Sequence, residues 1–264
     1  MQKLSFIEPR VRSDLRIGPH SEEFLSILFG SLLGDLSLEK EGPLAPSPRS
    51  AGGYAPEGGR PPRGGSAGCA ARSGGKIESV KLAFYQEKSN GEYLLYLHSK
   101  LSRLGYCNSK IPQISSRKKP DGTLRYYYRF KTYSYTSLNW VYDLFYKTSV
   151  LNGETYRRKV VPKEVKRFLT PLALAVWFMD DGTCYKNKGV RFSTNCFTLD
   201  EVKFLGEVLS EKYGLTYSIH KTGVVNQYSL YLPKTNLSNL KTLLLPHMHP
   251  SMYYKLGMWE SPLF

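Results

Sequence analysis

The stretch Pro171-Leu-Ala-Leu-Ala-Val-Trp-Phe-Met-Asp-Asp-Gly182 decides the fold. It begins with a proline, which is favoured in the first turn of a helix, and Thr170 before it is a suitable N-cap. Apolar residues fill nearly every side of the expected helix, so the helix is predicted to be buried. Asp180 and Asp181 follow at its end. Buried carboxylates are costly there unless a cation or a basic partner offsets them.

A weaker copy of this stretch, Phe24-Leu-Ser-Ile-Leu-Phe-Gly-Ser-Leu-Leu-Gly-Asp-Leu36, lies near the N-terminus. Its small residues would let two buried helices approach backbone to backbone, because glycine lacks the Cβ that keeps helices apart. That packing would bring Asp35 and Asp181 close together. Two carboxylates, with phosphate oxygens and water, form a ligand set that suits Mg²⁺. The pair of stretches therefore predicts metal-dependent phosphodiester chemistry.

These two stretches carry a family resemblance. Leu28-Phe-Gly-Ser-Leu-Leu-Gly-Asp-Leu36 and Leu174-Ala-Val-Trp-Phe-Met-Asp-Asp-Gly182 resemble the two motifs of a single-chain LAGLIDADG homing endonuclease. The resemblance implies a monomer that makes a Mg²⁺-dependent, site-specific double-strand cut in a long asymmetric DNA target. It also implies a gene within an organellar intron, in a mitochondrion or a chloroplast. Leu36 departs from the pattern, because it stands where the first motif should end in glycine.

Composition favours a nucleic-acid partner. The 264 residues include 37 Lys and Arg against 22 Asp and Glu, a formal net charge of +15, with 20 tyrosines and 12 phenylalanines interleaved among them. Such a pattern is typical of proteins that contact phosphate backbones and bases. No apolar run approaches the length of a membrane span, so no membrane partner is expected. The four cysteines have no metal-ligand spacing, which favours a reducing compartment.

The order of predicted elements repeats along the chain. Each half is predicted to read motif helix, β-hairpin, helix, β-hairpin, helix, so we expect an α/β (α+β) protein of two pseudo-symmetric αββαββα units. Their two antiparallel sheets would form a basic saddle over duplex DNA. The expected organisation is an N-terminal arm (1–20), a first half (21–150) and a second half (151–264). The second half opens with a basic linker around residues 156–163.

An abrupt change of composition interrupts the first half. Residues 42–75 are rich in Gly, Pro, Ala, Ser and Arg and have almost no large apolar side chains, so they are predicted to be a disordered insertion in a hairpin turn. A tolerated loop insertion is favoured over a nucleic-acid contact. The stretch also fits a mobile DNA element that has entered the reading frame and damaged an endonuclease.

Two carboxylates and two lysines are the predicted catalytic set. By the resemblance, the acidic residue just before the final glycine of each motif holds the metal, which selects Asp35 and Asp181 rather than Asp180. Lys159 precedes a Val-Val-Pro step and Lys255 lies in a Tyr-Tyr-Lys-Leu run, each after the last helix of its half. In such enzymes lysines at these places stabilise developing charge or organise the attacking water. The alternative is that both lysines only contact phosphates.

Other residues are predicted from their positions in the two halves. Gln86 matches a position that supports the metal or water network in the family, and Asn195 is the analogous residue of the second half. Base contacts are expected from the sheet faces, where alternation exposes every other residue to DNA. The DNA-binding candidates are Gln113, Ser115, Arg117, Lys119, Arg125, Tyr127, Arg129, Lys131, Arg191, Ser193, His220, Lys221, Gln227 and Ser229.

A competing function keeps the same fold. An RNA maturase that assists intron splicing, or another intron-RNA-binding relative without cleavage, would have the same charge and architecture. The joint presence of Asp35, Asp181, Lys159 and Lys255 favours the nuclease, because a protein that only binds RNA does not need all four.

Deletion of residues 43–75 is expected to leave the thermal stability of the protein nearly unchanged, because the segment offers little apolar surface to a core. The measurement is the melting temperature of the full-length and deleted chains. A large loss of stability would show that the segment packs against the core.

Overall fold

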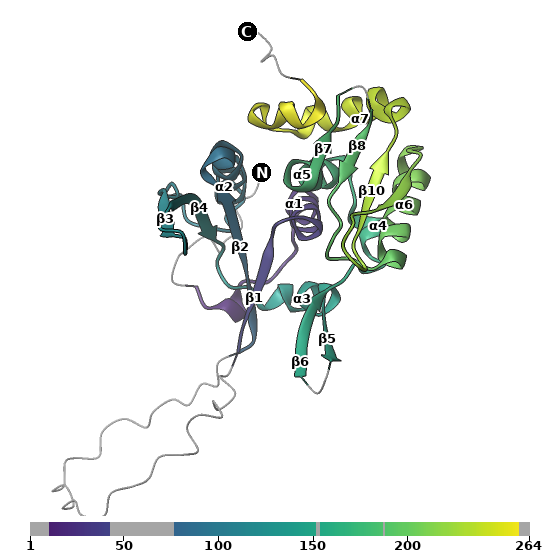
Figure 1. Cartoon of the computed structure of the whole chain (residues 1–264). Coiled ribbons are helices and arrows are strands. Elements are labelled where there is room, and N and C mark those ends of the chain that lie inside the picture. The colour runs from purple at the N-terminus through teal and green to yellow at the C-terminus, as the bar shows by residue number, and fades with distance from the viewer. Residues whose placement is uncertain (1–10, 43–76, 152–153, 187, 259–264) are drawn as a thin grey trace, which may run out of the picture.

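The computed structural model describes residues 11–42, 77–151, 154–186 and 188–258, with the side chains of residues 149–156 excepted (Figure 1). Residues 1–10 of the predicted arm and nearly all of the predicted insertion lie outside this part of the chain. The first unit contains α1 (Glu22–Leu33), β1 (Ser37–Glu41), β2 (Ser79–Glu87), α2 (Gly91–Arg103), β3 (Ser115–Lys118), β4 (Leu124–Lys131) and α3 (Asn139–Phe145). The second contains α5 (Pro171–Asp181), β7 (Gly182–Cys184), β8 (Val190–Phe192), α6 (Leu199–Tyr213), β9 (Ser218–Lys221), β10 (Tyr228–Leu232) and α7 (Leu237–Leu244).

Both units have the same topology. Each contains a four-stranded antiparallel sheet, with strand order β1-β2-β4-β3 in the first and β7-β8-β10-β9 in the second. The predicted αββαββα repeat is therefore confirmed. The two sheets lie on either side of α1 and α5, which occupy the centre of the molecule (Figure 1).

The two central helices pack through their backbones. Gly30 of α1 lies so close to α5 that a Cβ atom there would overlap the carbonyl oxygen of Ala173. Near the other end of this contact, the Thr170 hydroxyl donates to Ser26 Oγ at 2.8 Å. Glycine is required at residue 30 because any side chain would push the helices apart.

The helix ends follow the local signals. The Ser21 side chain accepts from the Phe24 amide at the start of α1, and the Thr170 side chain accepts from the Ala173 amide at the start of α5. These caps satisfy backbone donors that have no partner within the helix. Gly214 ends α6 in the left-handed conformation. The cap predicted at Thr170 is thus present.

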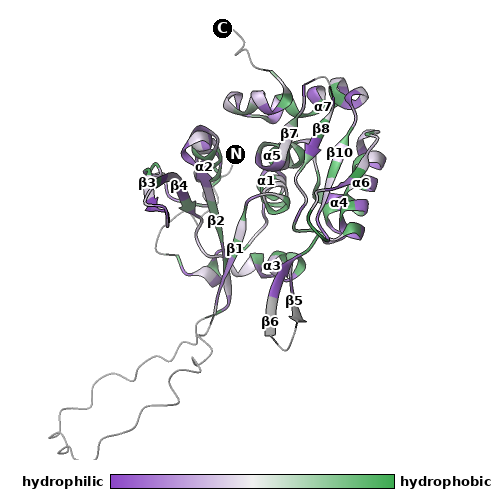
Figure 2. Cartoon of the chain, viewed as in Figure 1, coloured by the Kyte–Doolittle hydropathy of each residue, from purple (hydrophilic) through white to green (hydrophobic). Residues whose placement is uncertain are grey.

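Outer helices are amphipathic, as their mixture of hydrophobic and hydrophilic residues in Figure 2 shows. On α2, for example, Leu94, Leu97 and Leu101 are buried against the first sheet while Ser99 and Arg103 face solvent. In the described part of the chain, no helix combines the length and the apolar character needed to cross a bilayer.

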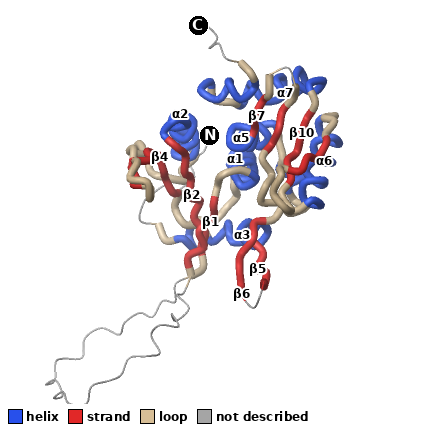
Figure 3. Tube along the Cα trace, in the orientation of Figure 1, coloured by secondary structure: helices blue, strands red, loops and turns tan. Residues whose placement is uncertain are grey.

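The expected linker between the two halves is corrected. Residues 156–163 are not a simple linker: β6 (Glu154–Lys159) pairs with β5 (Tyr146–Leu151) in an antiparallel hairpin that Figure 3 shows as an arm beside α3. A short helix, α4 (Val165–Phe168), follows it. In the second unit, the second strand of the first hairpin covers only Val190–Phe192, because a turn redirects the chain toward α6.

The second half of the predicted arm is packed rather than extended. The Arg16 side chain is buried, donates to the Ser134 carbonyl at 3.0 Å and lies over the Tyr133 ring. The His20 ring nitrogens hydrogen-bond to the hydroxyls of Tyr106 and Ser137. Non-local contacts of this kind carry no periodic sequence signal.

The substitution Gly30→Ala is expected to destabilise the protein by about 1–3 kcal/mol, because the added methyl overlaps the α5 backbone. The matched control is Ser31→Ala on the same helix, where the wild-type hydroxyl is buried without a hydrogen-bond partner. Removing that hydroxyl should be neutral or stabilising. Thermal unfolding measures both changes, and equal effects would contradict the backbone-contact explanation.

Candidate functional site

The packing of α1 against α5 brings two carboxylates together. Asp35 follows α1 and is exposed, whereas Asp181 is the last residue of α5 and is partly buried. The two groups are close enough for the charge of Asp35 to affect the titration of Asp181. The structure thus brings the two predicted metal ligands into one site.

A third carboxylate lies in the helix interface. Asp180 contacts Gly34, and a Cβ atom on residue 34 would lie 2.6 Å from Oδ2 of Asp180. The Tyr93 hydroxyl donates to the Val176 carbonyl at 3.4 Å and lies close enough to this carboxyl group to influence its pKa. Asp180 therefore fills space that a glycine on the facing helix leaves open, while Asp181 is the outer of the two neighbouring acids.

Each predicted lysine binds the C-terminal end of one of the two motif helices. Lys159 Nζ donates to the carbonyl oxygens of Gly34 at 2.9 Å and Leu36 at 3.0 Å. Lys255 Nζ donates to those of Met179 at 2.6 Å and Asp180 at 2.7 Å. Gly34 and Asp180 each directly precede a site carboxylate, so the two lysines occupy equivalent places. A cation at a helix C-terminus is favoured by the helix dipole.

Gln86 and Asn195 differ in what they contact. Gln86 is buried on β2 and its Nε2 donates to Asp35 Oδ2 at 2.8 Å. Asn195 is exposed in the turn after β8, and no hydrogen bond of its side chain occurs among the described residues. The structure brings Gln86 to the site but gives Asn195 no equivalent contact.

Burial and mutual repulsion shape the electrostatics. Burial, followed by the charge of Asp35, raises the pKa of Asp181 to about 7, although Lys255 and Lys159 oppose the shift. Burial also raises the pKa of Asp180 well above its ordinary value, with Asp35 and Asp181 adding to the effect. Burial lowers the pKa of both Lys159 and Lys255, and the surrounding carboxylates oppose that shift. The site therefore holds more negative charge than its two lysines neutralise.

One face of the first sheet carries most of its predicted DNA-binding residues. Val80, Leu82 and Phe84 of β2 point to the buried side. The strand register then places the alternate residues together on the opposite face, here called the outer face. The predicted residues on it are Ser115, Arg117, Arg125, Tyr127, Arg129 and Lys131. Gln113 precedes β3 and Lys119 lies in the β3–β4 turn, both exposed.

On the second sheet, two of the predicted residues lie differently from the expectation. Ser229 is buried, and its hydroxyl donates to the His220 carbonyl at 3.4 Å. Arg191, Ser229 and His220 share a face by the strand register, opposite the buried Phe192 and Leu230. Ser193 and Gln227 flank these strands. Lys221 is a correction: it pairs with Tyr228 and so points to the same side as Leu230, away from His220.

Sequence reasoning missed acidic and aromatic groups on these faces. Glu41 pairs with Lys81 at 2.6 Å, Glu39 pairs with Lys131 at 2.7 Å, and Glu87 pairs with Arg125. Tyr85 lies beside Tyr127 on the first sheet, and Tyr231 stacks on His220 on the second. Alternation along β1 and β2 would have identified the glutamates, but the pairing partners depend on strand register.

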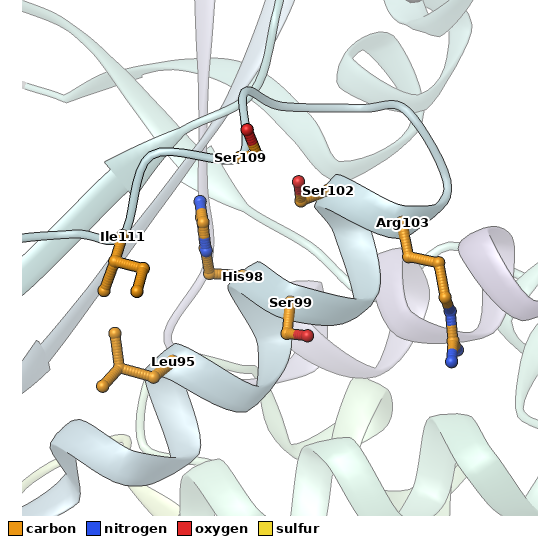
Figure 4. A pocket seen from close by; sticks show the side chains of 7 residues that line it. All are labelled: Leu95, His98, Ser99, Ser102, Arg103, Ser109 and Ile111. Atoms are coloured by element: carbon orange, nitrogen blue, oxygen red, sulfur yellow. The ribbon is translucent and has the colours of Figure 1, made fainter.

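A separate hollow of about 470 Å³ lies between α2 and the loop that follows it. Three serine hydroxyls line it, and Figure 4 shows Arg103 directed away from the other lining side chains. It therefore offers no concentrated charge. Among the described residues no group of three or more His, Cys, Asp or Glu side chains is arranged to hold a metal ion. A metal at Asp35 and Asp181 would need further ligands from substrate and water.

The comparisons with known proteins identify the family. Residues 65–240 match the LAGLIDADG DNA endonuclease family. The cytochrome b mRNA maturase bI2 of Debaryomyces hansenii is 37% identical over 239 residues, which cover 90% of this chain and 75% of that protein. The chain therefore belongs to the LAGLIDADG DNA endonuclease family.

Two further relatives differ in coverage. The cytochrome b mRNA maturase bI2 of Saccharomyces cerevisiae is 37% identical over 91% of this chain, but the chain spans only 49% of its length. The intron-encoded endonuclease ai4 of Dictyostelium discoideum is 39% identical over 158 residues, 58% of this chain and 94% of that protein.

A solved structure confirms the fold. The homing endonuclease I-WcaI, bound to its DNA recognition sequence, superposes with a TM-score of 0.65 and 21% sequence identity. The match covers 94% of each chain. The two-sheet architecture around the central helices is thus that of a LAGLIDADG homing endonuclease.

The pH dependence of stability tests whether the charged form of Asp181 destabilises the folded protein. The pKa of Asp181 rises from 3.8 to about 7 on folding, so the folded state of the metal-free protein loses stability as pH rises between these values. The substitution Asp181→Asn should raise the melting temperature at pH 8 by about 3–6 °C and leave it nearly unchanged at pH 4.

Thermal scans in EDTA measure this effect, with the exposed Asp200→Asn as the control. A gain of the same size at both pH values would contradict the repulsion argument.

Proposed function

We propose that this protein is a site-specific endonuclease that makes a metal-dependent double-strand cut in DNA. The observation that carries the proposal is the pairing of Asp35 and Asp181 at the ends of two packed helices, each end held by a lysine. Membership of the family and the DNA-bound state of I-WcaI support it.

The carboxylates fit a divalent metal. They provide hard oxygen ligands, and a bound cation would offset the burial and the repulsion from Asp35 that raise the pKa of Asp181. A Mg²⁺ ion held by Asp35 and Asp181 would polarise the scissile phosphate and help to generate hydroxide. Phosphate oxygens and water would complete its coordination, since Mg²⁺ keeps much of its hydration shell.

The lysines have a defined part in this chemistry. An ammonium group has three donors. Carbonyl oxygens take two of them at Lys159 and two at Lys255. The remaining donor of each could bind a phosphate oxygen and stabilise the charge that develops on it. With one lysine in each unit, each strand of a duplex would have its own.

The outer faces of the two sheets would bind the DNA. The net charge of +15 and the arginines and lysines on the first sheet favour a polyanion. The second sheet contributes Arg191 and His220. Since the two faces carry different residues, the target would be asymmetric, and one chain would suffice as a monomer.

The relatives support an organellar location. Two of them are named as maturases of the cytochrome b mRNA. We infer that this chain acts in an organelle and, on this support, in the mitochondrion, as the product of an intron.

The first experiment is cleavage of a randomised duplex library by the purified protein in Mg²⁺. Wild-type protein should cut both strands of a selected site. Asp35→Asn and Asp181→Asn should each lower the cleavage rate by at least about 100-fold, since each removes a metal ligand. Binding of the same duplex in EDTA should persist. Cleavage that survives both substitutions would refute the assigned centre.

A second function, assistance of intron splicing, is favoured by the two maturase relatives that match about nine-tenths of the chain. Splicing of an intron RNA by purified protein in Mg²⁺ tests it. If Asp35→Asn abolishes cutting and leaves splicing intact, the two activities coexist. If the wild-type protein binds and splices RNA but cleaves no DNA, the proposed nuclease function is rejected in favour of the maturase function.

A further inference from the structure

Three hydrogen bonds run in series from the C-terminal segment to a site carboxylate. The Tyr254 hydroxyl donates to Asn90 Oδ1 at 3.5 Å, and Asn90 Nδ2 donates to Gln86 Oε1 at 3.3 Å. Gln86 Nε2 then donates to Asp35 Oδ2 at 2.8 Å. Tyr254 lies in η7 (Pro250–Leu256) of the second unit, whereas the other three residues belong to the first. The series, here called the relay, therefore crosses between the units.

The relay fixes which way each amide faces. A side-chain amide has one acceptor oxygen and one nitrogen with two donors. Because Asn90 donates to the Gln86 oxygen, the Gln86 nitrogen is directed to Asp35. If Gln86 turned over, its oxygen would face a carboxylate and its nitrogen would face another donor. The carboxylate of Asp35 only accepts, so it sets the direction of the whole series, and the Tyr254 hydroxyl completes the series by donating to the Asn90 oxygen.

The position of Asn90 shows that its side chain does not serve the helix. Asn90 is the N-cap residue of α2, a position where asparagine commonly accepts a hydrogen bond from the backbone. No such bond is present, and the side chain contacts Gln86 and Tyr254 instead. Asn90 is also the last residue of the 3-10 turn η3 (Lys88–Asn90), which runs directly into α2, so the start of the helix does not occupy its side chain. The side chain is therefore available for the contact with Gln86.

Tyr254 connects the relay to the segment that lies beside Asp181, the site carboxylate of the second unit. Its neighbour Lys255 binds the carbonyl oxygens at the end of α5. The segment that places Lys255 beside Asp181 therefore also supports the carboxylate of the first unit.

The second unit has no equivalent support. In the described part of the chain, the carboxyl group of Asp181 accepts no hydrogen bond, and Asn195, the candidate counterpart of Gln86, is exposed without one. Asp35 is held in one orientation while Asp181 is not. The two centres are unequal before any substrate binds.

We propose that Asn90 and Tyr254 are positioning residues that orient Asp35 through Gln86, so that cutting of one DNA strand depends on them more than cutting of the other. This proposal rests on the proposed cleavage function. Groups that orient the residues around a metal site are commonly worth about 10-fold or more in activity.

The test follows each strand of a selected duplex, labelled on both strands, in Mg²⁺. Gln86→Ala, Asn90→Ala and Tyr254→Phe should each slow the same strand by about 10-fold and leave the other nearly unchanged, so that nicked product accumulates. Asn90→Ala should add nothing in a Gln86→Ala background, because the relay is already broken. Asn90→Asp, which cannot donate to Gln86, should behave like Asn90→Ala.

The matched control is Asn239→Ala, which also removes a side-chain amide hydrogen bond, here to the Tyr213 carbonyl. It should cause no difference between the strands. A purely structural role for Asn90 predicts equal slowing of both strands, or effects that multiply with those of Gln86→Ala, and either result overturns the proposal.

A metal-free measurement separates this proposal from the cleavage function. In EDTA, the melting-temperature losses of Asn90→Ala and Tyr254→Phe should be less than additive, because both remove the same bond. Losses from Asn239→Ala and Tyr254→Phe should add. If the wild type cuts no DNA, the cleavage function fails, and the comparison of the single and double variants then decides alone whether the relay exists. Additive losses of melting temperature would exclude the relay.

Discussion

The structure depends on the close backbone contact between α1 and α5. Gly30 against the Ala173 carbonyl sets the separation of the helices, and this separation brings their C-terminal ends together. Two carboxylates, Asp35 and Asp181, become neighbours as a result. Their repulsion and the burial of Asp181 disfavour folding, in line with the raised pKa of Asp181. The apolar faces of both helices, buried along nearly their whole length, offset that cost. A strained site is thus maintained by a rigid core.

The lysines resolve a second electrostatic problem at the same helix ends. The C-terminus of a helix carries partial negative charge on carbonyls without partners, and here carboxylates follow directly. Lys159 and Lys255 satisfy those carbonyls and reduce the repulsion. Each lysine is itself partly desolvated, which lowers its pKa against the pull of the acids. The charges are therefore mutually dependent, and removal of either lysine would change the pKa of Asp181.

Sequence alone predicted the elements that local chemistry determines. The cap at Thr170, the repeat of αββαββα and the pairing of Asp35 with Asp181 all follow from periodicity, capping residues and duplication. It did not predict the β5–β6 hairpin, the side to which Lys221 points or the relay through Asn90. Each of these depends on strand register or on contacts between segments far apart in the chain. The ion pairs of the first sheet were missed for the same reason.

In a single chain, the two motif helices can carry different residues at equivalent places of their interface, which is impossible in a symmetric dimer. Gly34 and Asp180 occupy equivalent places, each just before a site carboxylate, and they face each other in the helix interface. In a dimer of identical subunits both places would hold the same residue. Two glycines would leave a gap, and two aspartates would collide and repel. Duplication within one chain lets one helix carry the small residue and the other the large one. The same freedom lets only one centre acquire a relay, so the inequality of the two centres follows from the duplication itself.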